Sequence, residues 1–274
     1  MYVPPRPDFT TDLRLALPPS TGASESKRCV LVDLPDTHLV GFDVQADASV
    51  HHVLLGVHDP ADRAALQALD AADPDPGWAC DEHFMGTADV RPDRVPVLWF
   101  PSPAPTRMFP GTGVPLGGVG VLQVHALGPG DGGELLLAVD DDVRDEISLP
   151  LGTGDVDLPP GRDQAVLTRK AYLRDLLPDG ISGPVQVLGG RGHGHELLSR
   201  LTIRLDDDPV LDLVRWDPRV QPRYLLTEPI LATPDQVVAL TCTYDTTPQA
   251  RARAAEYGDE GEMCGGWLFV AGVD

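Results

Sequence analysis

The chain has few positive charges, and this scarcity excludes nucleic acid as a partner. Its 274 residues include 21 Lys and Arg against 42 Asp and Glu, so the formal net charge is −21, and only Lys27 and Lys170 are lysines. A surface this acidic repels phosphate backbones. No apolar run approaches the roughly 18 residues of a membrane span, so we expect no membrane insertion. The first ten residues contain three prolines and no apolar core, so no signal peptide is visible.

Cysteine is scarce, and the chain has no Cys-x-x-Cys motif, which disfavours a structural zinc knuckle. The four cysteines fall two in each half, at Cys29, Cys80, Cys242 and Cys264. They allow three disulfide pairings, of which pairing within each half is the simplest if the halves are separate domains. Buried free thiols are the alternative. Disulfides would favour an oxidising, secreted or extracytoplasmic location, whereas the missing signal peptide favours the cytoplasm.

Long amphipathic helical patterns are also nearly missing. The 28 glycines and 28 prolines are spread throughout the chain and read as turns between many short strands. Short strands at this spacing predict an all-β fold of antiparallel sandwiches. The predicted strands are 29–33, 39–44, 50–57, 95–100, 120–126, 134–139, 165–168, 185–188, 198–205, 237–244 and 267–270.

One clear helix interrupts the first half. Asp59 can cap it, Pro60 suits its first turn, and apolar residues follow at helical spacing until Asp73. A short helix near 170–177 and a helix or loop at 249–257 are weaker predictions. The acidic stretch 140–146 is the best boundary, which divides the chain into domains 1–145 and 146–274.

Two groups of histidines are candidate metal ligands. His51 and His52 lie in an apolar strand, where neighbouring side chains point to opposite faces, so both can bind one metal only if the strand bulges or ends there. His125 ends another apolar strand. His193 and His195 are two residues apart among glycines, a spacing that places both rings on one face of a strand. Each group also has an ordinary interpretation, as core or loop histidines.

Met263 is one of only four methionines. A thioether is a soft ligand suited to Cu(I), although a methionine beside a cysteine is commonly core filler. Nucleophile elbows and phosphate loops are missing from the sequence. Zinc hydrolysis on His193 and His195 would need a general base, for which Glu196 is the only immediate candidate, and on a strand Glu196 points to the opposite face.

Taken in order, these motifs resemble the copper type II, ascorbate-dependent monooxygenases, which include peptidylglycine α-hydroxylating monooxygenase and dopamine β-monooxygenase. The resemblance runs from about Asp8 to Val270. Its landmarks in the first half are residues 28–35, 50–55, 77–82, 97–100, 105–114 and 121–125, and in the second half residues 191–195, 216, 221–224, 241–244 and 262–264.

The resemblance implies two tandem jelly-roll β-sandwiches with one copper ion in each. It implies that the first copper is bound by His51, His52 and His125, and the second by His193, His195 and Met263. It also implies disulfides between Cys29 and Cys80 and between Cys242 and Cys264.

The implied chemistry follows from the ligand types. The three-histidine copper would take single electrons from ascorbate, and the His2Met copper, the catalytic one, would react with O2 because soft sulfur favours Cu(I). Gln123, two residues before His125, would share its strand face and help orient the first site as an electron-transfer residue.

The sequence departs from this family at the substrate site. Arg191 stands where the peptidylglycine enzyme has an arginine that holds the substrate carboxylate, but Gly265 and Trp267 replace that arginine's asparagine and tyrosine partners. C-terminal peptidylglycine is therefore disfavoured, and Trp267 favours a flatter or more apolar group. A further family disulfide is missing, and its two positions hold His58 and Met85, which pack ordinarily or bind metal.

The resulting prediction is a dicopper monooxygenase that hydroxylates a C–H bond of a peptide or small-molecule substrate. The alternative is a non-catalytic copper-binding module. The sequence indicates no oligomeric state.

Overall fold

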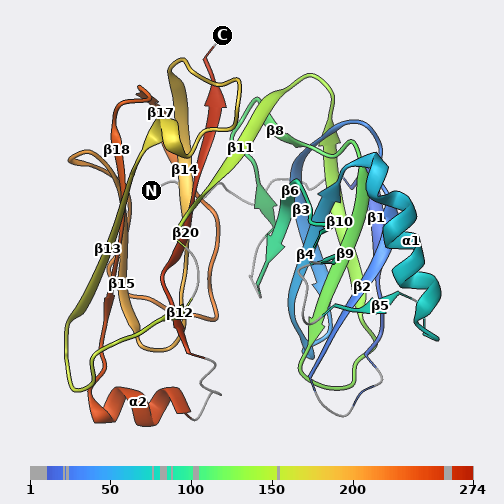
Figure 1. The fold of residues 1–274 in the computed structure, drawn as a ribbon, viewed down its shortest axis with the longest axis horizontal. Helices are drawn as coiled ribbons and strands as arrows, with labels where there is room; N and C mark the ends of the chain where they lie inside the picture. The colour runs from blue at the N-terminus through green and yellow to red at the C-terminus, as the bar shows by residue number, and fades with distance from the viewer. Residues whose placement is uncertain are drawn as a thin grey trace. The chain divides into compact units, whose positions relative to one another are not determined.

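The computed structural model describes residues 11–20, 22, 25–75, 77–80, 85–87, 89–100, 105–152, 155–255 and 261–273. Strands dominate, and the chain divides into two compact units at the bond between Asp145 and Glu146 (Figure 1). The all-β class predicted from the sequence is confirmed.

Nearly all strands of the first unit belong to two sheets. Its elements are β1 (Leu13–Leu17), β2 (Ser26–Asp33), β3 (His38–Ala46), β4 (Val50–His58), η1 (Pro60–Asp62), α1 (Arg63–Ala72), β5 (Trp78–Ala79), β6 (Arg94–Trp99), β7 (Thr106–Arg107), β8 (Thr112–Pro115), β9 (Val119–Ala126) and β10 (Gly133–Asp140).

The second unit is built in the same way, and its first strand begins at the end of the first unit. Its elements are β11 (Arg144–Leu151), β12 (Asp155–Val156), β13 (Ala165–Tyr172), η2 (Leu173–Asp175), β14 (Val185–His193), β15 (Leu198–Leu205), β16 (Asp208–Leu213), β17 (Tyr224–Ala232), β18 (Val237–Tyr244), α2 (Pro248–Ala255), β19 (Glu262–Met263) and β20 (Gly265–Gly272).

Both units have the strand order of a jelly roll. The main sheets of the first unit run β1-β10-β3-β8 and β2-β9-β4-β6, and those of the second unit run β11-β20-β14-β17 and β13-β18-β15-β16. When the eight long strands of each unit are numbered along the chain, both pairs of sheets read 1-8-3-6 and 2-7-4-5. Two interleaved Greek keys give this order. The predicted double jelly roll is therefore present.

The β2-β9-β4-β6 sheet is buried on both faces in the first unit. On β9, Leu122 and Val124 belong to the core between the sheets, whereas Val119 and Val121 belong to a second cluster on the outer face. Leu66 of α1 is completely buried in that outer cluster. Gln123 and His125 share the outer face because side chains alternate along a strand.

The helix predicted after Asp59 is confirmed. The Asp59 carboxylate accepts the N–H of Ala61, and the helix continues until Ala72. The predicted helix near residues 170–177 is wrong, because β13 continues to Tyr172 in pairing with β18, and only a short 3-10 turn follows. The ambiguous stretch 249–257 contains most of α2.

Candidate metal centres

The first group of histidines is brought together by a β-bulge. The register between β4 and β9 shifts between Val50 and His52, so Val50 pairs with Ala126 while His52 pairs with His125. His51 is the extra residue. A bulge re-aims a side chain that would otherwise point to the opposite face. The sequence allowed a shared metal only if the strand bulged or ended here, and the bulge is present.

The three rings converge through one edge each. The Nδ1 atom of His125 lies 3.3 Å from Nδ1 of His51 and 3.2 Å from Nδ1 of His52. One ring nitrogen from each histidine lies within 4.8 Å of the other two, so the group could hold a metal ion. Three imidazoles with this convergence suit copper or zinc.

The opposite ring edges of His52 and His125 face side-chain oxygens. His52 Nε2 lies 3.4 Å from Oε1 of Gln123, and His125 Nε2 lies 2.6 Å from a carboxylate oxygen of Glu25. A proton on each Nε2 would leave the Nδ1 lone pair for a metal. The Gln123 amide is oriented in turn by the Cys29–Cys80 disulfide, since its Nε2 lies 3.4 Å from Cys80 Sγ.

Burial keeps His52 neutral. Desolvation, together with the nearby His125 and His51 rings, lowers the pKa of His52 from 6.5 to about 3. A histidine must be neutral to bind a metal, so this site is ready to bind without releasing a proton from His52 at neutral pH.

The second group lies at the end of β14. Arg191 and His193 alternate along this strand with Gly190 and Gly192, and a Cβ on Gly192 would lie 2.8 Å from the Leu201 side chain in the core. The His193 ring therefore lies on the outer face. The sequence predicted that His193 and His195 share one strand. The strand ends at His193, however, and His195 lies just before the following turn. The two ring centroids are still only 5.5 Å apart.

Both rings of this group use Nδ1 for hydrogen bonds. His193 Nδ1 lies 2.8 Å from Oε1 of Gln221, and His195 Nδ1 contacts the carbonyl oxygen of Gly261. Donation from Nδ1 would leave Nε2 as the nitrogen that can bind a metal, which is the reverse of the first group. Burial is the main cause that lowers the pKa of His193 to about 4.

A carboxylate ties Met263 to this histidine segment. Glu262 is buried and accepts the backbone N–H groups of His195 at 3.1 Å and Leu197 at 2.5 Å. The Tyr244 hydroxyl donates to the Met263 carbonyl at 2.8 Å. That carbonyl lies 3.0 Å from where a Cβ on Gly194 would stand, so glycine permits the close approach.

The strand register gives the same neighbours. His193 pairs with Gly265 across β14 and β20, two residues after Met263 in the chain. The Cys242–Cys264 disulfide anchors the chain directly after Met263. Both predicted disulfides are thus present.

The predicted substrate residues lie beside the second group. Arg191 pairs with Trp267 across β14 and β20, and the Trp267 ring centroid lies 6.3 Å from that of His193. Arg191 is buried, and desolvation together with the Arg223 charge lowers its pKa to about 9. Arg223 contacts the buried carboxylate of Glu146 and stacks on Phe269.

His58 and Met85, at the positions of the missing family disulfide, lie close together. Both are buried, and His58 Cε1 lies 3.5 Å from where a Cβ on Gly86 would stand. Neither ring nitrogen of His58 has a hydrogen bond of good geometry among the described residues. The Met85 side chain packs against Gly56. These contacts fit ordinary packing.

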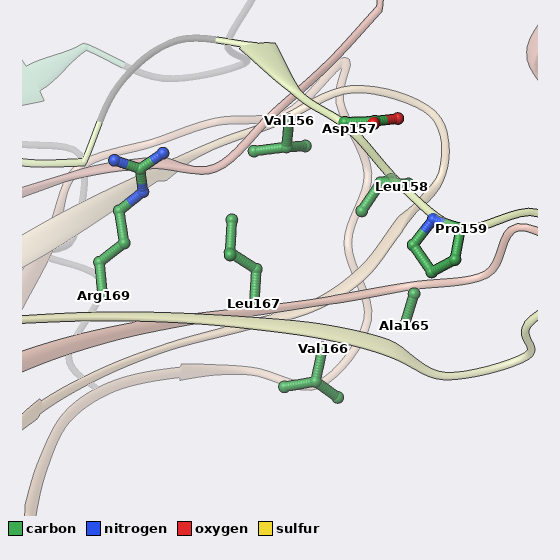
Figure 2. A pocket seen from close by; sticks show the side chains of 8 residues that line it. All are labelled: Val156, Asp157, Leu158, Pro159, Ala165, Val166, Leu167 and Arg169. Atoms are coloured by element: carbon green, nitrogen blue, oxygen red, sulfur yellow. The ribbon is translucent and has the colours of Figure 1, made fainter.

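A separate hollow of about 250 Å³ lies in the second unit between β12 and β13. Figure 2 shows Val156, Leu167 and Arg169 directed toward a common space. None of the predicted site residues lines it. It contributes nothing to the histidine groups.

Sequence reasoning missed the residues that support the ligands. Gln221 and Glu262 stood within the family landmarks but had no role assigned, and Glu25 had no signal at all. The supporting contacts of Glu25 and Gln221 join different strands or loops, so only the folded register reveals them.

Comparison with protein-family models finds no match, and comparison with curated proteins finds none either. Among the described residues, no helix is long and apolar enough to cross a membrane.

Proposed function

We propose that the chain is a dicopper monooxygenase that hydroxylates a C–H bond of a peptide or small-molecule substrate. The observation that carries the proposal is the convergence of the adjacent His51 and His52 with His125, 73 residues after His52, at a β-bulge. The pair of His193 and His195 beside Met263 supplies a second and softer donor set.

The donor sets fit copper. The first set offers three imidazole nitrogens, and the second offers two imidazole nitrogens and the thioether of Met263. Imidazole suits both copper oxidation states, whereas sulfur favours Cu(I). Copper bound in these sets would supply one-electron redox chemistry and reactivity toward O2.

The overall reaction would insert one oxygen atom of O2 into the substrate C–H bond. The other oxygen atom leaves as water, which consumes two protons and two electrons. The electrons would come one at a time from a reductant such as ascorbate.

The chain's own residues divide the remaining work. Gln221 and Gly261 hold the two second-unit imidazoles with Nε2 outward, and Glu262 keeps Met263 next to them. Trp267, beside His193, offers a flat apolar surface for the substrate. This surface favours a planar or apolar group of the substrate. Arg191, which pairs with Trp267 across β14 and β20, would favour a negatively charged group beside it.

The first test is copper stoichiometry after copper loading and removal of excess metal. We expect two copper ions per chain, one in His193→Ala, one in His125→Ala, and two in His38→Ala. His38 is a suitable control because it lies outside both groups, in a contact with Asp145. Native protein with fewer than two coppers, or unchanged loading in His193→Ala, contradicts the proposal.

The second test separates catalysis from simple copper binding. Loaded protein and ascorbate are screened for O2 uptake against peptides and small aromatic compounds, with ¹⁸O2 incorporation into the product as the readout. Two bound coppers without substrate-dependent oxygen incorporation would favour the non-catalytic copper-binding module. The replacement of the asparagine and tyrosine of the family's substrate clamp by Gly265 and Trp267 is the feature that supports this alternative.

A further inference from the structure

Glu25 occupies a specific place next to the first histidine group. It directly precedes β2, whose register with β9 places Lys27 opposite His125 and Ser26 opposite Ala126. From there its carboxylate reaches His125 Nε2 at 2.6 Å, while its other ionic neighbour, Lys27, is more distant at 3.8 Å. The His125 side chain is only 5% exposed, whereas the Glu25 side chain is 45% exposed, so the contact is shielded from water on the imidazole side only.

The two nitrogens of His125 thus have different neighbours. Nδ1 faces His51 and His52, and Nε2 faces the carboxylate. The contact of His125 Nε2 with the carboxylate has the distance of an ion pair but not the geometry of a hydrogen bond, so its effect is electrostatic. A negative charge this close to an imidazole favours its positive form and makes it a more basic ligand. His52 has the weaker version of this arrangement, because its Nε2 faces the neutral amide oxygen of Gln123 at 3.4 Å.

We infer that Glu25 is a positioning residue that sets the reduction potential of the copper bound by His51, His52 and His125. This inference rests on the proposed function. A more basic ligand stabilises Cu(II) more than Cu(I), so the Glu25 carboxylate lowers the potential. A copper held by these three histidines would then give up an electron more readily, which would suit a site that hands electrons on.

The test is a redox titration of the first site alone. A His193→Ala/His195→Ala background removes the second site, and the copper signal is followed by electron paramagnetic resonance. We expect Glu25→Gln to weaken Cu(II) binding 10–100-fold while it changes Cu(I) binding much less. Each tenfold loss of Cu(II) affinity that is not matched by a loss of Cu(I) affinity raises the reduction potential of the copper by about 59 mV.

Glu134→Gln is the matched control. Glu134 lies in the same unit, carries the same charge and has a side chain 46% exposed against 45% for Glu25, but it pairs with Arg14. We expect the copper in the Glu134→Gln variant to have the same reduction potential as the copper in the His193→Ala/His195→Ala protein. An equal shift in both variants would mean a general charge effect and would overturn the role of Glu25.

The outcomes separate this inference from the proposed function. Absence of a copper signal in the background protein would refute the three-histidine copper site itself. A normal signal with an unchanged potential in Glu25→Gln would refute only the inference. A change in the ligand-derived hyperfine pattern of Glu25→Gln would make Glu25 a direct ligand and would also overturn it.

Discussion

Glu262 joins two segments of the second candidate centre, and its removal provides a direct test of how that centre is built. Its carboxylate accepts two backbone N–H groups, from His195 and Leu197, and it directly precedes Met263. In Glu262→Ala both hydrogen bonds are lost, and the Leu197 N–H stays buried without its acceptor. Hydrogen bonds to a charged group contribute about 1.5–3 kcal/mol each, so we expect a loss of roughly 3–6 kcal/mol from the free energy of unfolding.

The loss should be confined to the second unit. Urea unfolding followed by tryptophan fluorescence measures the stability, and amide hydrogen exchange measures the opening of His195 and Leu197 locally. Glu228→Ala is the control, because Glu228 is an exposed acidic residue of the same unit on β17. We expect Glu228→Ala to change the stability by no more than about 0.5 kcal/mol.

The same variant tests the arrangement of the ligands. If Glu262 keeps Met263 beside His195, Glu262→Ala should also weaken Cu(I) binding at the second site and leave the first site unchanged. Unfolding at the wild-type urea concentration would refute the stability estimate. Lower stability with unchanged Cu(I) affinity would refute the role of Glu262 in holding the ligands together.

Two further predictions concern the disulfides and a buried histidine. Paired Cys→Ala variants remove one disulfide each, and denaturant unfolding measures the free energy of unfolding that is lost. We expect a loss of about 4 kcal/mol for Cys29–Cys80, which spans 51 residues, and about 3 kcal/mol for Cys242–Cys264, which spans 22. A larger effect for the shorter loop would show that native packing outweighs chain entropy. Burial lowers the pKa of His58 against the opposing effect of two nearby carboxylates. The unfolded chain therefore binds a proton at His58 that the folded protein excludes. The free energy of unfolding should fall as the pH drops below about 6.5, by up to about 1.4 kcal/mol per pH unit. Metal-free His58→Leu should lose less stability than the wild type between pH 7 and pH 5, and parallel curves would contradict this explanation.

Most strands that could be predicted from the sequence have long apolar runs, and β6 was among them although it contains Pro96. Strands such as β9, β15 and β18 read as continuous or alternating apolar segments. The second unit's β16 and β17 were missed, and they contain Pro209 and Pro229. Both are edge strands of their sheets. Proline is tolerated there because an edge strand need not donate every N–H to a neighbour.

β11 was missed for a different reason. Its first residues lie in an acidic stretch that reads as a linker, and Pro150 breaks its apolar pattern. Its pairing with β20 extends over six residues that are distant in sequence. A local pattern cannot reveal a strand whose main stabilisation comes from such a distant partner.

The candidate ligands could be predicted because residue type restricts metal chemistry strongly. The geometry that makes them usable could not. The bulge at His51 was only a condition in the sequence, since an unbulged strand would send His51 and His52 to opposite faces. Gln221 and Glu25 act through contacts that depend on how strands and loops come together, and an isolated glutamine or glutamate carries no such information.

The two centres are not copies of each other, although the two units share one strand order. The first histidine group lies on the β2-β9-β4-β6 sheet, which is the 2-7-4-5 sheet of its jelly roll. The second lies at the end of β14, in the 1-8-3-6 sheet of the other. The two groups also leave different nitrogens for a metal: Nδ1 atoms converge in the first group, whereas Nδ1 is hydrogen-bonded in the second and leaves Nε2. Because different sheets and different supporting residues build them, a change such as Glu25→Gln or Glu262→Ala should act on one centre alone, which makes the two halves of the proposed chemistry separable by experiment.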